Sequence, residues 1–122
     1  MTVFINPKEV QELMQKEQTF ILNIVVSWCP DCVAQAKNIA DFTQEFIPEK
    51  VPVYELNVQN EKHVYLSEDH ENLTVKCGGH GFPRTVLIKK GVIFDANNVE
   101  IISADQLASL ACKFKQELKL RS

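Results

Sequence analysis

The sequence predicts an α/β protein in which a central mixed β-sheet is flanked by α-helices. Residues 19–26 form a continuous apolar run rich in branched side chains, which is typical of a buried strand. Apolar residues recur at helical spacing over 30–46, and two short apolar runs at 85–88 and 92–94 flank a Lys-Lys-Gly turn. Strands that alternate with helices in this way place the helices on the faces of a sheet.

The first predicted elements are a short strand at 3–5 and a helix that runs to about residue 17. Asn6 is a favourable N-cap and Pro7 suits the first helical position. Glu9 completes a capping box with Asn6. The helix start is therefore defined by local chemistry before any packing is considered.

The next elements are a helix over 30–46, which Pro48 ends, and a strand at 51–58. For the less regular stretch that follows, we expect a short helix around 64–66 and an acidic surface loop at 67–72. After the hairpin at 85–94, Ser103 and Gln106 form a second capping box at the start of a terminal helix. Cys112 falls in the apolar pattern of that helix and is expected to be a small core residue.

Length and composition are those of one globular domain spanning 1–122, with 45% apolar and 24% charged residues. No apolar run approaches the roughly 20 residues that cross a bilayer, and the N-terminus has no secretory signal pattern. We therefore expect a cytoplasmic protein without a membrane partner. The net charge of −3, with acids and bases intermixed, predicts no nucleic-acid partner.

Two thiols, Cys29 and Cys32, lie where the buried strand ends and the next helix begins. Pro30 at the first helical position makes Cys29 the N-cap, so backbone N–H groups and the helix dipole favour its thiolate. This predicts Cys29 as a nucleophile and Cys32, nearer the helix interior, as the resolving thiol. Asp31 should raise the pKa of Cys29 by like-charge repulsion, which favours a reductant or moderate exchanger over a strong oxidant.

The residues around this dithiol resemble the thioredoxin-like superfamily over nearly the whole chain. Trp28-Cys29 followed by Cys32 is similar to a thioredoxin active site, whereas the internal Pro30-Asp31 resembles the glutaredoxin order. The segment 81–91, Gly-Phe-Pro-Arg-Thr-Val-Leu-Ile-Lys-Lys-Gly, resembles the family's proline segment and the hairpin after it. The resemblance implies a thioredoxin-like fold.

The same resemblance implies that Pro83 is a cis-proline facing the dithiol and that Phe82 pairs with an extended substrate segment. Arg84 stands where the family usually has Thr, and it either lies near Cys29 and lowers the thiol pKa or points to solvent. Asn23 occupies the position at which thioredoxins carry a buried Asp, which assists proton transfer from the resolving thiol. Because an amide cannot take a proton, Cys32 needs water or another base.

Further differences from the family lie before Pro83. The extra residues at 61–75 are expected to influence partner choice, and the glutathione-binding pattern of glutaredoxins is not matched. The resemblance implies that the loop containing Cys77 and His80 lies near the dithiol. We favour the interpretation of His80 as a surface histidine and of Cys77 as a buried apolar residue, over a base and a third redox thiol.

These observations predict a thiol-disulfide oxidoreductase in cell redox homeostasis, with no cofactor beyond a redox-active Cys29–Cys32 disulfide. Its substrates would be disulfide-containing proteins or small thiols, and a reductase or a low-molecular-weight thiol would regenerate it. One alternative is a noncatalytic thioredoxin-fold module that binds a protein partner. A second is a zinc site formed by Cys29, Cys32, Cys77 and His80, although no metal is the favoured expectation.

Overall fold

The computed structural model describes residues 3–119, so the ends of the predicted 1–122 domain lie outside the described residues. Six strands form one mixed sheet in the order β1-β3-β2-β5-β6, with β4 paired to β3. β1, β3 and β2 are mutually parallel, β5 is antiparallel to β2, and β6 is antiparallel to β5. The strands are β1 Val3–Phe4, β2 Phe20–Val26, β3 Val53–Glu61, β4 Val64–Tyr65, β5 Arg84–Lys89 and β6 Val92–Val99.

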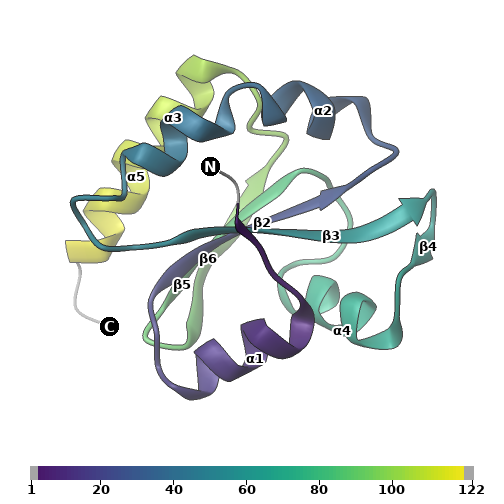
Figure 1. Cartoon of the computed structure of the whole chain (residues 1–122). Coiled ribbons are helices and arrows are strands. Elements are labelled where there is room, and N and C mark those ends of the chain that lie inside the picture. The colour runs from purple at the N-terminus through teal and green to yellow at the C-terminus, as the bar shows by residue number, and fades with distance from the viewer. Residues whose placement is uncertain (1–2, 120–122) are drawn as a thin grey trace.

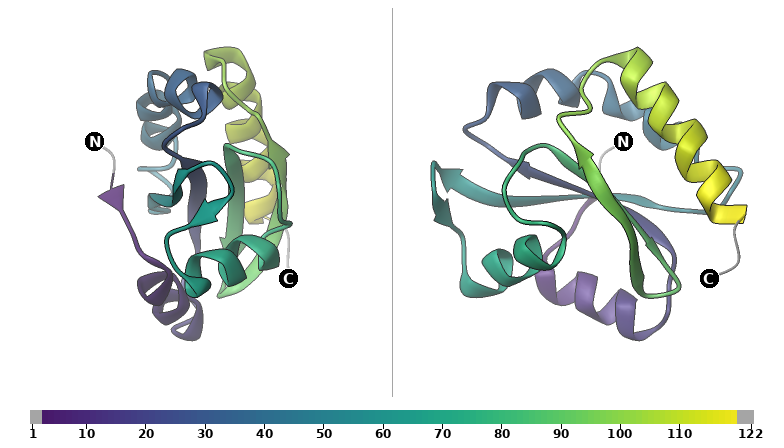
Figure 2. Two further views of the ribbon diagram at one scale, coloured as in Figure 1. Left: turned by 90° about the vertical axis from the view of Figure 1, so that its right-hand side faces the viewer. Right: turned by 180° about the vertical axis from the view of Figure 1, so that it is seen from behind.

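Helices cover both faces of this sheet, which confirms the predicted α/β class (Figure 1). The helices α2, α3 and α5 lie on one side and α1 and α4 on the other, as the side view in Figure 2 also shows. Their bounds are α1 Pro7–Gln15, α2 Pro30–Ala36, α3 Ile39–Gln44, α4 Glu68–Lys76 and α5 Ala104–Lys119.

The hydrophobic core is divided by the sheet into two clusters. Alternate residues of β2 supply both: Leu22 and Ile24 pack on the α1 side, whereas Ile21 packs with α3 and α5. All seven residues of β2 are buried, as a central strand requires. The dithiol follows this fully buried strand after Ser27 and Trp28.

Both predicted capping boxes are confirmed. The Asn6 side chain accepts from the Glu9 N–H at 2.8 Å, and the Glu9 carboxylate accepts from the Asn6 N–H at 3.1 Å. Ser103 and Gln106 make the same reciprocal pair before α5, both at 3.1 Å. These helix starts were predictable because each depends on residues three apart in the chain.

The predicted helix over 30–46 is wrong in one respect, because it is two helices that break at Lys37 and Asn38. The break coincides with side-chain bonds to a distant segment. Gln35 and Asn38 donate to the carbonyls of Ile101 and Ile102 at 2.9 and 3.0 Å. Tertiary bonds to the loop before α5 thus accompany the change of direction.

The region 64–72 also differs from the prediction. Val64 and Tyr65 are not helical and form β4 against β3, and the expected acidic loop is the first half of α4. Ser67 caps α4 by accepting from the His70 N–H at 3.3 Å. Carboxylates in the first turn of a helix are stabilised by its dipole, so the acidic run favours this helix start.

The four cysteines are all free thiols with different exposure. Cys29, Cys32 and Cys77 are buried, whereas Cys112 is exposed on α5. The expectation that Cys112 belongs to the core is therefore wrong, because it lies beside the buried stripe of α5 and not on it. Within residues 3–119, no helix is long and apolar enough to cross a membrane.

Candidate active site at the start of α2

The strand-to-helix junction places Cys29 at the N-cap of α2 with Pro30 at the first helical position, as predicted. The backbone of Cys29 is extended, with φ −91° and ψ 121°, and its carbonyl accepts from the Val33 N–H at 3.2 Å. The side chain makes no capping hydrogen bond. The expected bond from a helix N–H to the Cys29 sulfur is therefore absent.

The Cys29 sulfur lies instead against the segment that contains the second motif. Its Sγ is 3.9 Å from the carbonyl oxygen of Phe82, and the Phe82–Pro83 peptide bond is cis. Phe82 is 8% exposed and packs in the same core cluster as both thiols. The site thus combines residues that are more than fifty positions apart in the chain.

Cys32 is held as a neutral thiol. The pKa of Cys32 is raised to about 12, mainly by burial; a backbone hydrogen bond at Val26 opposes the shift, and the hydrogen bond to Cys29 and the charges of Cys29 and Asp31 add to it. The two cysteines are similarly enclosed, at 8% exposure for Cys29 and 7% for Cys32. The sequence expectation that Cys32 is the less exposed thiol is met only marginally.

A hollow of about 240 Å³ opens over Cys29. Trp28 and Asp31 line it beside the dithiol, and Phe82 lines it from the opposite segment. The Trp28 ring is fixed at its edge, where Nε1 donates to Gln59 Oε1 at 3.0 Å, and Lys62 Nζ lies 5.7 Å from its centroid. The indole ring is therefore held in one orientation, in which it lines the hollow.

Asn23 is buried in the middle of β2, and both halves of its amide are satisfied. Its Nδ2 donates to Gln35 Oε1 at 2.7 Å, and its Oδ1 accepts from the Thr85 hydroxyl at 3.1 Å. Gln35 Nε2 in turn donates to the Ile101 carbonyl at 2.9 Å. This chain of neutral groups ties β2 to α2 and β5 and has no member that can accept the Cys32 proton.

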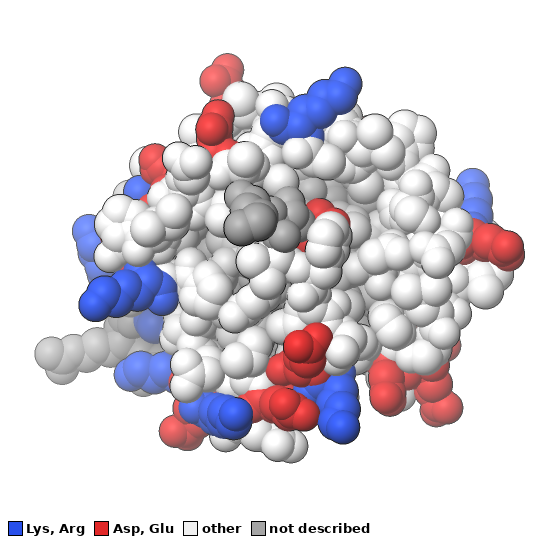
Figure 3. Space-filling view, viewed as in Figure 1, with Lys and Arg blue, Asp and Glu red and all other residues white. Residues whose placement is uncertain are grey.

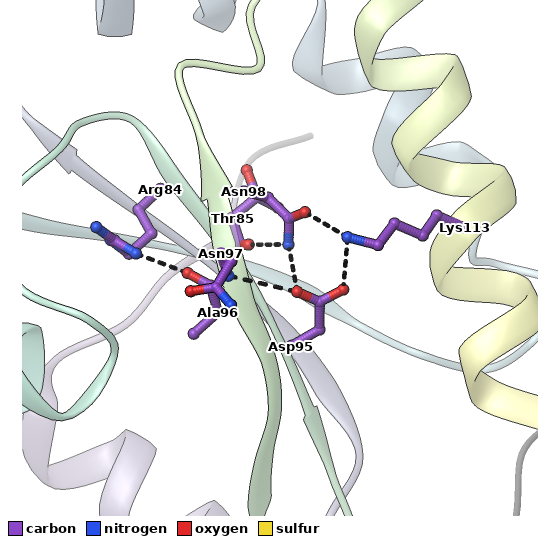
Figure 4. Close-up of polar contacts among 7 residues, drawn as sticks. All are labelled: Arg84, Thr85, Asp95, Ala96, Asn97, Asn98 and Lys113. Carbon is purple, nitrogen blue, oxygen red and sulfur yellow. Dashed lines mark hydrogen bonds and ion pairs between the residues drawn. The ribbon is translucent and has the colours of Figure 1, made fainter.

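The same polar layer continues toward α5, as Figure 4 shows. Asn98 Nδ2 donates to the Thr85 carbonyl and to Asp95 Oδ1 at 3.1 and 3.0 Å. Lys113 on α5 bridges the Asn98 and Asp95 side-chain oxygens, at 2.9 Å to each. Buried polar groups are retained here because they are hydrogen-bonded to one another.

Arg84 takes neither of the two positions expected for it. It is 5% exposed, so it does not point to solvent, and its guanidinium donates to the carbonyls of Ala96 and His80 rather than approaching Cys29. Figure 4 shows it on the far side of β6 from Lys113. A Cβ on Gly78 would lie 2.5 Å from Arg84 Nη1, so this glycine provides the space that the guanidinium fills. Arg84 acts as a clamp on the 78–81 loop.

The loop before Pro83 brings His80 to the hollow over Cys29, whereas Cys77 belongs to the same core cluster as both thiols and does not line that hollow. His80 is exposed and lines the hollow over Cys29. Cys77 is fully buried, and burial raises its pKa to about 11 despite the opposing charge of Arg84. Among residues 3–119, no three His, Cys, Asp or Glu side chains are grouped so as to hold a metal ion, which contradicts the alternative zinc site.

Three site residues were missed by sequence reasoning, namely Gln35, Gln59 and His63. Gln35 lies at a helical spacing of three from Cys32 and Gln59 lies just beyond the predicted strand 51–58, and both are within 1% of complete burial. For Gln35, the conflict between a polar residue type and an apolar position was the available signal. His63 follows β3 with a positive φ of 67° and lines the hollow, and no pattern in the sequence indicates this position.

Comparison with known proteins gives structural likeness only. No protein-family model matches the sequence, and no curated protein matches it either. Thioredoxin f2 from Chlamydomonas reinhardtii superimposes with a TM-score of 0.69 at 12% identity, covering 94% of this chain and 97% of that one. Thioredoxin from Aeropyrum pernix superimposes with a TM-score of 0.67 at 20% identity, covering 94% of this chain and 86% of that one. Mitochondrial thioredoxin 3 from Saccharomyces cerevisiae, in its oxidised form, superimposes with a TM-score of 0.66 at 18% identity, covering 95% of this chain and 94% of that one.

Proposed function

We propose that this chain, which has a thioredoxin-like fold, is a thiol-disulfide oxidoreductase of thioredoxin or glutaredoxin type. One observation carries the proposal: two free thiols open a helix, and the first faces the carbonyl beside the cis Phe82–Pro83 bond. A dithiol supplies two electrons by closing its own disulfide, so no additional cofactor is needed.

In the proposed first step, the Cys29 thiolate attacks one sulfur of a substrate disulfide. A Cys29–substrate disulfide forms, and the other substrate sulfur leaves as a thiolate. The hollow lined by Trp28, Asp31 and Phe82 receives the attacked sulfur.

In the second step, Cys32 attacks Cys29 Sγ and releases the bound half of the substrate. Since burial holds the Cys32 pKa near 12, its sulfur is protonated at neutral pH until the attack. Asn23 cannot take that proton because it is an amide. We propose that the proton passes to the departing substrate thiolate, which leaves as a thiol while the Cys29–Cys32 disulfide closes.

Regeneration needs two electrons from outside the chain, from a reductase or a low-molecular-weight thiol. Cys77 and Cys112 are also free thiols. Unpaired cysteines are typical of a reducing compartment, so we propose the cytoplasm as the location.

The test is reduction of insulin disulfides by the full chain with dithiothreitol as electron donor. Cys29→Ser should lose the activity, and Cys32→Ser should accumulate a mixed disulfide visible by non-reducing electrophoresis. Cys112→Ser is the matched control, because this thiol is exposed on α5 and lines neither wall of the site. Activity of Cys29→Ser equal to that of the unaltered chain would refute the proposal.

A noncatalytic binding module is the second candidate, and the closed amide network at Asn23 favours it. A scaffold without a redox function needs no proton acceptor beside its thiols, and both cysteines are less than a tenth exposed. This candidate predicts partner binding that survives the double replacement of Cys29 and Cys32 by serine. Negligible disulfide exchange by the unaltered chain must accompany it.

A further inference from the structure

Two hollows meet beside the dithiol and form one groove. The hollow over Cys29 measures about 240 Å³. A larger one of about 1230 Å³ extends between β4 and α4. Gln59, His63 and His80 line both, so they form the passage from one to the other. We call the combined depression the α4 groove.

The α4 groove carries an excess of negative charge. The chain as a whole has 16 acidic against 13 basic residues, so a balanced surface would mix both signs. A space-filling view shows acidic side chains gathered at the lower right of the molecule, over the start of α4 (Figure 3). The groove is lined by one lysine, Lys76, and by five carboxylates, Asp31, Glu68, Asp69, Glu71 and Glu100, and a second cation, Lys62, lies 5.7 Å from the centroid of the Trp28 ring in its wall.

These carboxylates are not neutralised by ion pairs within residues 3–119. The two ion pairs formed there join Lys113 to Asp95 and Lys115 to Glu45, away from the groove. An uncompensated cluster of one sign attracts ligands of the opposite sign and speeds their association.

Gln59 supplies an independent sign of a ligand at the passage. Its Oε1 accepts from Trp28 Nε1 at 3.0 Å and from the His63 N–H at 3.2 Å, so the orientation of the amide is fixed. Its Nε2 is fully buried and has no hydrogen-bond partner among the described residues. A buried donor without an acceptor is costly and is relieved when a ligand supplies one. A peptide carbonyl has that chemistry.

We propose that the α4 groove selects protein disulfides whose cysteine is flanked by an extended, positively charged segment. The proposal rests on the proposed oxidoreductase function and names its substrate class. A backbone carbonyl near the cysteine accepts from Gln59 Nε2, and lysine or arginine side chains further along lie against Glu68, Asp69 and Glu71. Glutathione disulfide, which carries more carboxylates than amines, is a poor substrate for the same reason.

The experiment compares three disulfide-linked peptide dimers that differ only in the residues beside the cysteine: three lysines, three glutamates or three serines. The reduced full chain is mixed with each peptide at low ionic strength, and oxidation is followed by Trp28 fluorescence. We expect the lysine peptide to react about tenfold faster than the glutamate peptide, as three weak ion pairs predict. Half-molar salt should shrink that ratio toward one.

Matched charge variants locate the effect. Replacing Glu68, Asp69 and Glu71 by Gln, Asn and Gln should abolish most of the lysine preference. Replacing Glu12, Asp41 and Glu49 in the same way alters net charge equally, but these exposed residues lie outside the groove and the preference should persist. The serine peptide should react at the same rate with both variants, which shows that the dithiol and fold are intact.

The outcomes separate the two levels of the proposal. Equal rates for the lysine and glutamate peptides, or a preference that both triple variants lose alike, would overturn the substrate class and leave the oxidoreductase function standing. Reaction with none of the three peptides would overturn the oxidoreductase function and this inference together.

Discussion

Asn23 and Gln59 are both fully enclosed amides on neighbouring strands, yet their hydrogen bonding differs. Asn23 is 1% exposed, and its oxygen and nitrogen both have partners within the chain. Gln59 is 0% exposed, and only its oxygen has partners. The polar layer around Asn23 is complete and structural, whereas the one at Gln59 is incomplete in the protein alone and is suited to binding.

This difference also separates two functions of the site, structural support around Asn23 and substrate binding beside Cys29. The hydrogen bonds of Asn23, Gln35 and Thr85 join β2, α2 and β5, and none of these three side chains titrates. The surface beside Cys29 contributes charge, an indole and a spare donor. Replacing groups in either region tests whether that division holds.

The largest difference is expected between Asn23→Leu and Gln59→Leu. The first leaves Gln35 Oε1 and the Thr85 hydroxyl buried without partners, which should cost about 3 kcal/mol of unfolding free energy. The second removes a donor that has no partner and leaves only Trp28 Nε1 and the His63 N–H, which are nearer the surface, without their acceptor. A loss of about 1 kcal/mol of unfolding free energy is therefore expected. Urea denaturation at pH 7 measures both, and equal losses would remove the distinction.

A pH-dependent effect is expected from Asn23→Asp. A protonated carboxyl can still donate to Gln35 Oε1, whereas a carboxylate cannot and is also desolvated. The folded-state pKa should therefore exceed the usual value of about 3.9. Stability should be near that of the unaltered chain at pH 4 and be lost as pH rises, by about 2 kcal/mol at pH 7.

The control for this variant is Asn60→Asp, an exposed amide one residue beyond Gln59. Thermal unfolding is measured for both variants and the unaltered chain from pH 4 to pH 7. If the Asn23→Asp curve runs parallel to that of the control, the Asn23 site is more accessible to water than the hydrogen-bond pattern indicates.

The Arg84 clamp predicts coupling between two positions. Gly78→Ala places a Cβ 2.5 Å from Arg84 Nη1 on a backbone with φ 118°, so it should cost about 2 kcal/mol in the unaltered chain. In an Arg84→Met background the guanidinium is gone and only the backbone strain remains. A double-mutant cycle by urea denaturation should give a coupling of about 1 kcal/mol, and simple additivity would argue against the clamp.

A further pH-dependent effect is expected at alkaline pH and concerns Cys77. Burial raises its pKa to about 11, above the 9.0 of an unperturbed thiol. The thiol form is therefore favoured by folding, and its contribution is intact below pH 9 and lost as pH rises toward 11. Unfolding free energy of Cys77→Ala should fall less steeply over that range, and Cys112→Ser should retain the full slope.

The parts of the fold that the sequence predicts correctly are those determined locally. Capping boxes at Asn6 and Ser103 involve side chains three residues apart, and the position of Cys29 follows from Pro30 and the preceding apolar run. Such features need no knowledge of distant contacts. The dithiol at the start of a helix was therefore predictable from residues 20–32 alone.

The errors arise where tertiary contacts decide. The break between α2 and α3 coincides with bonds to carbonyls at 101 and 102, more than sixty residues away. β4 exists because β3 is longer than its apolar pattern and offers Gln59 and Glu61 as pairing partners. The position of Arg84 depends on space left by Gly78 and on the Ala96 carbonyl in β6. None of these contacts has a local signature.

The exposed thiol on α5 has a practical consequence for handling the protein. Cys112 is the accessible sulfur among four, whereas the other three are enclosed. In a concentrated sample left in air, dioxygen can join two such sulfurs and produce covalent dimers that are unrelated to turnover. Serine at this position keeps preparations homogeneous, and the native cysteine offers a ready attachment point for a fluorophore or spin label.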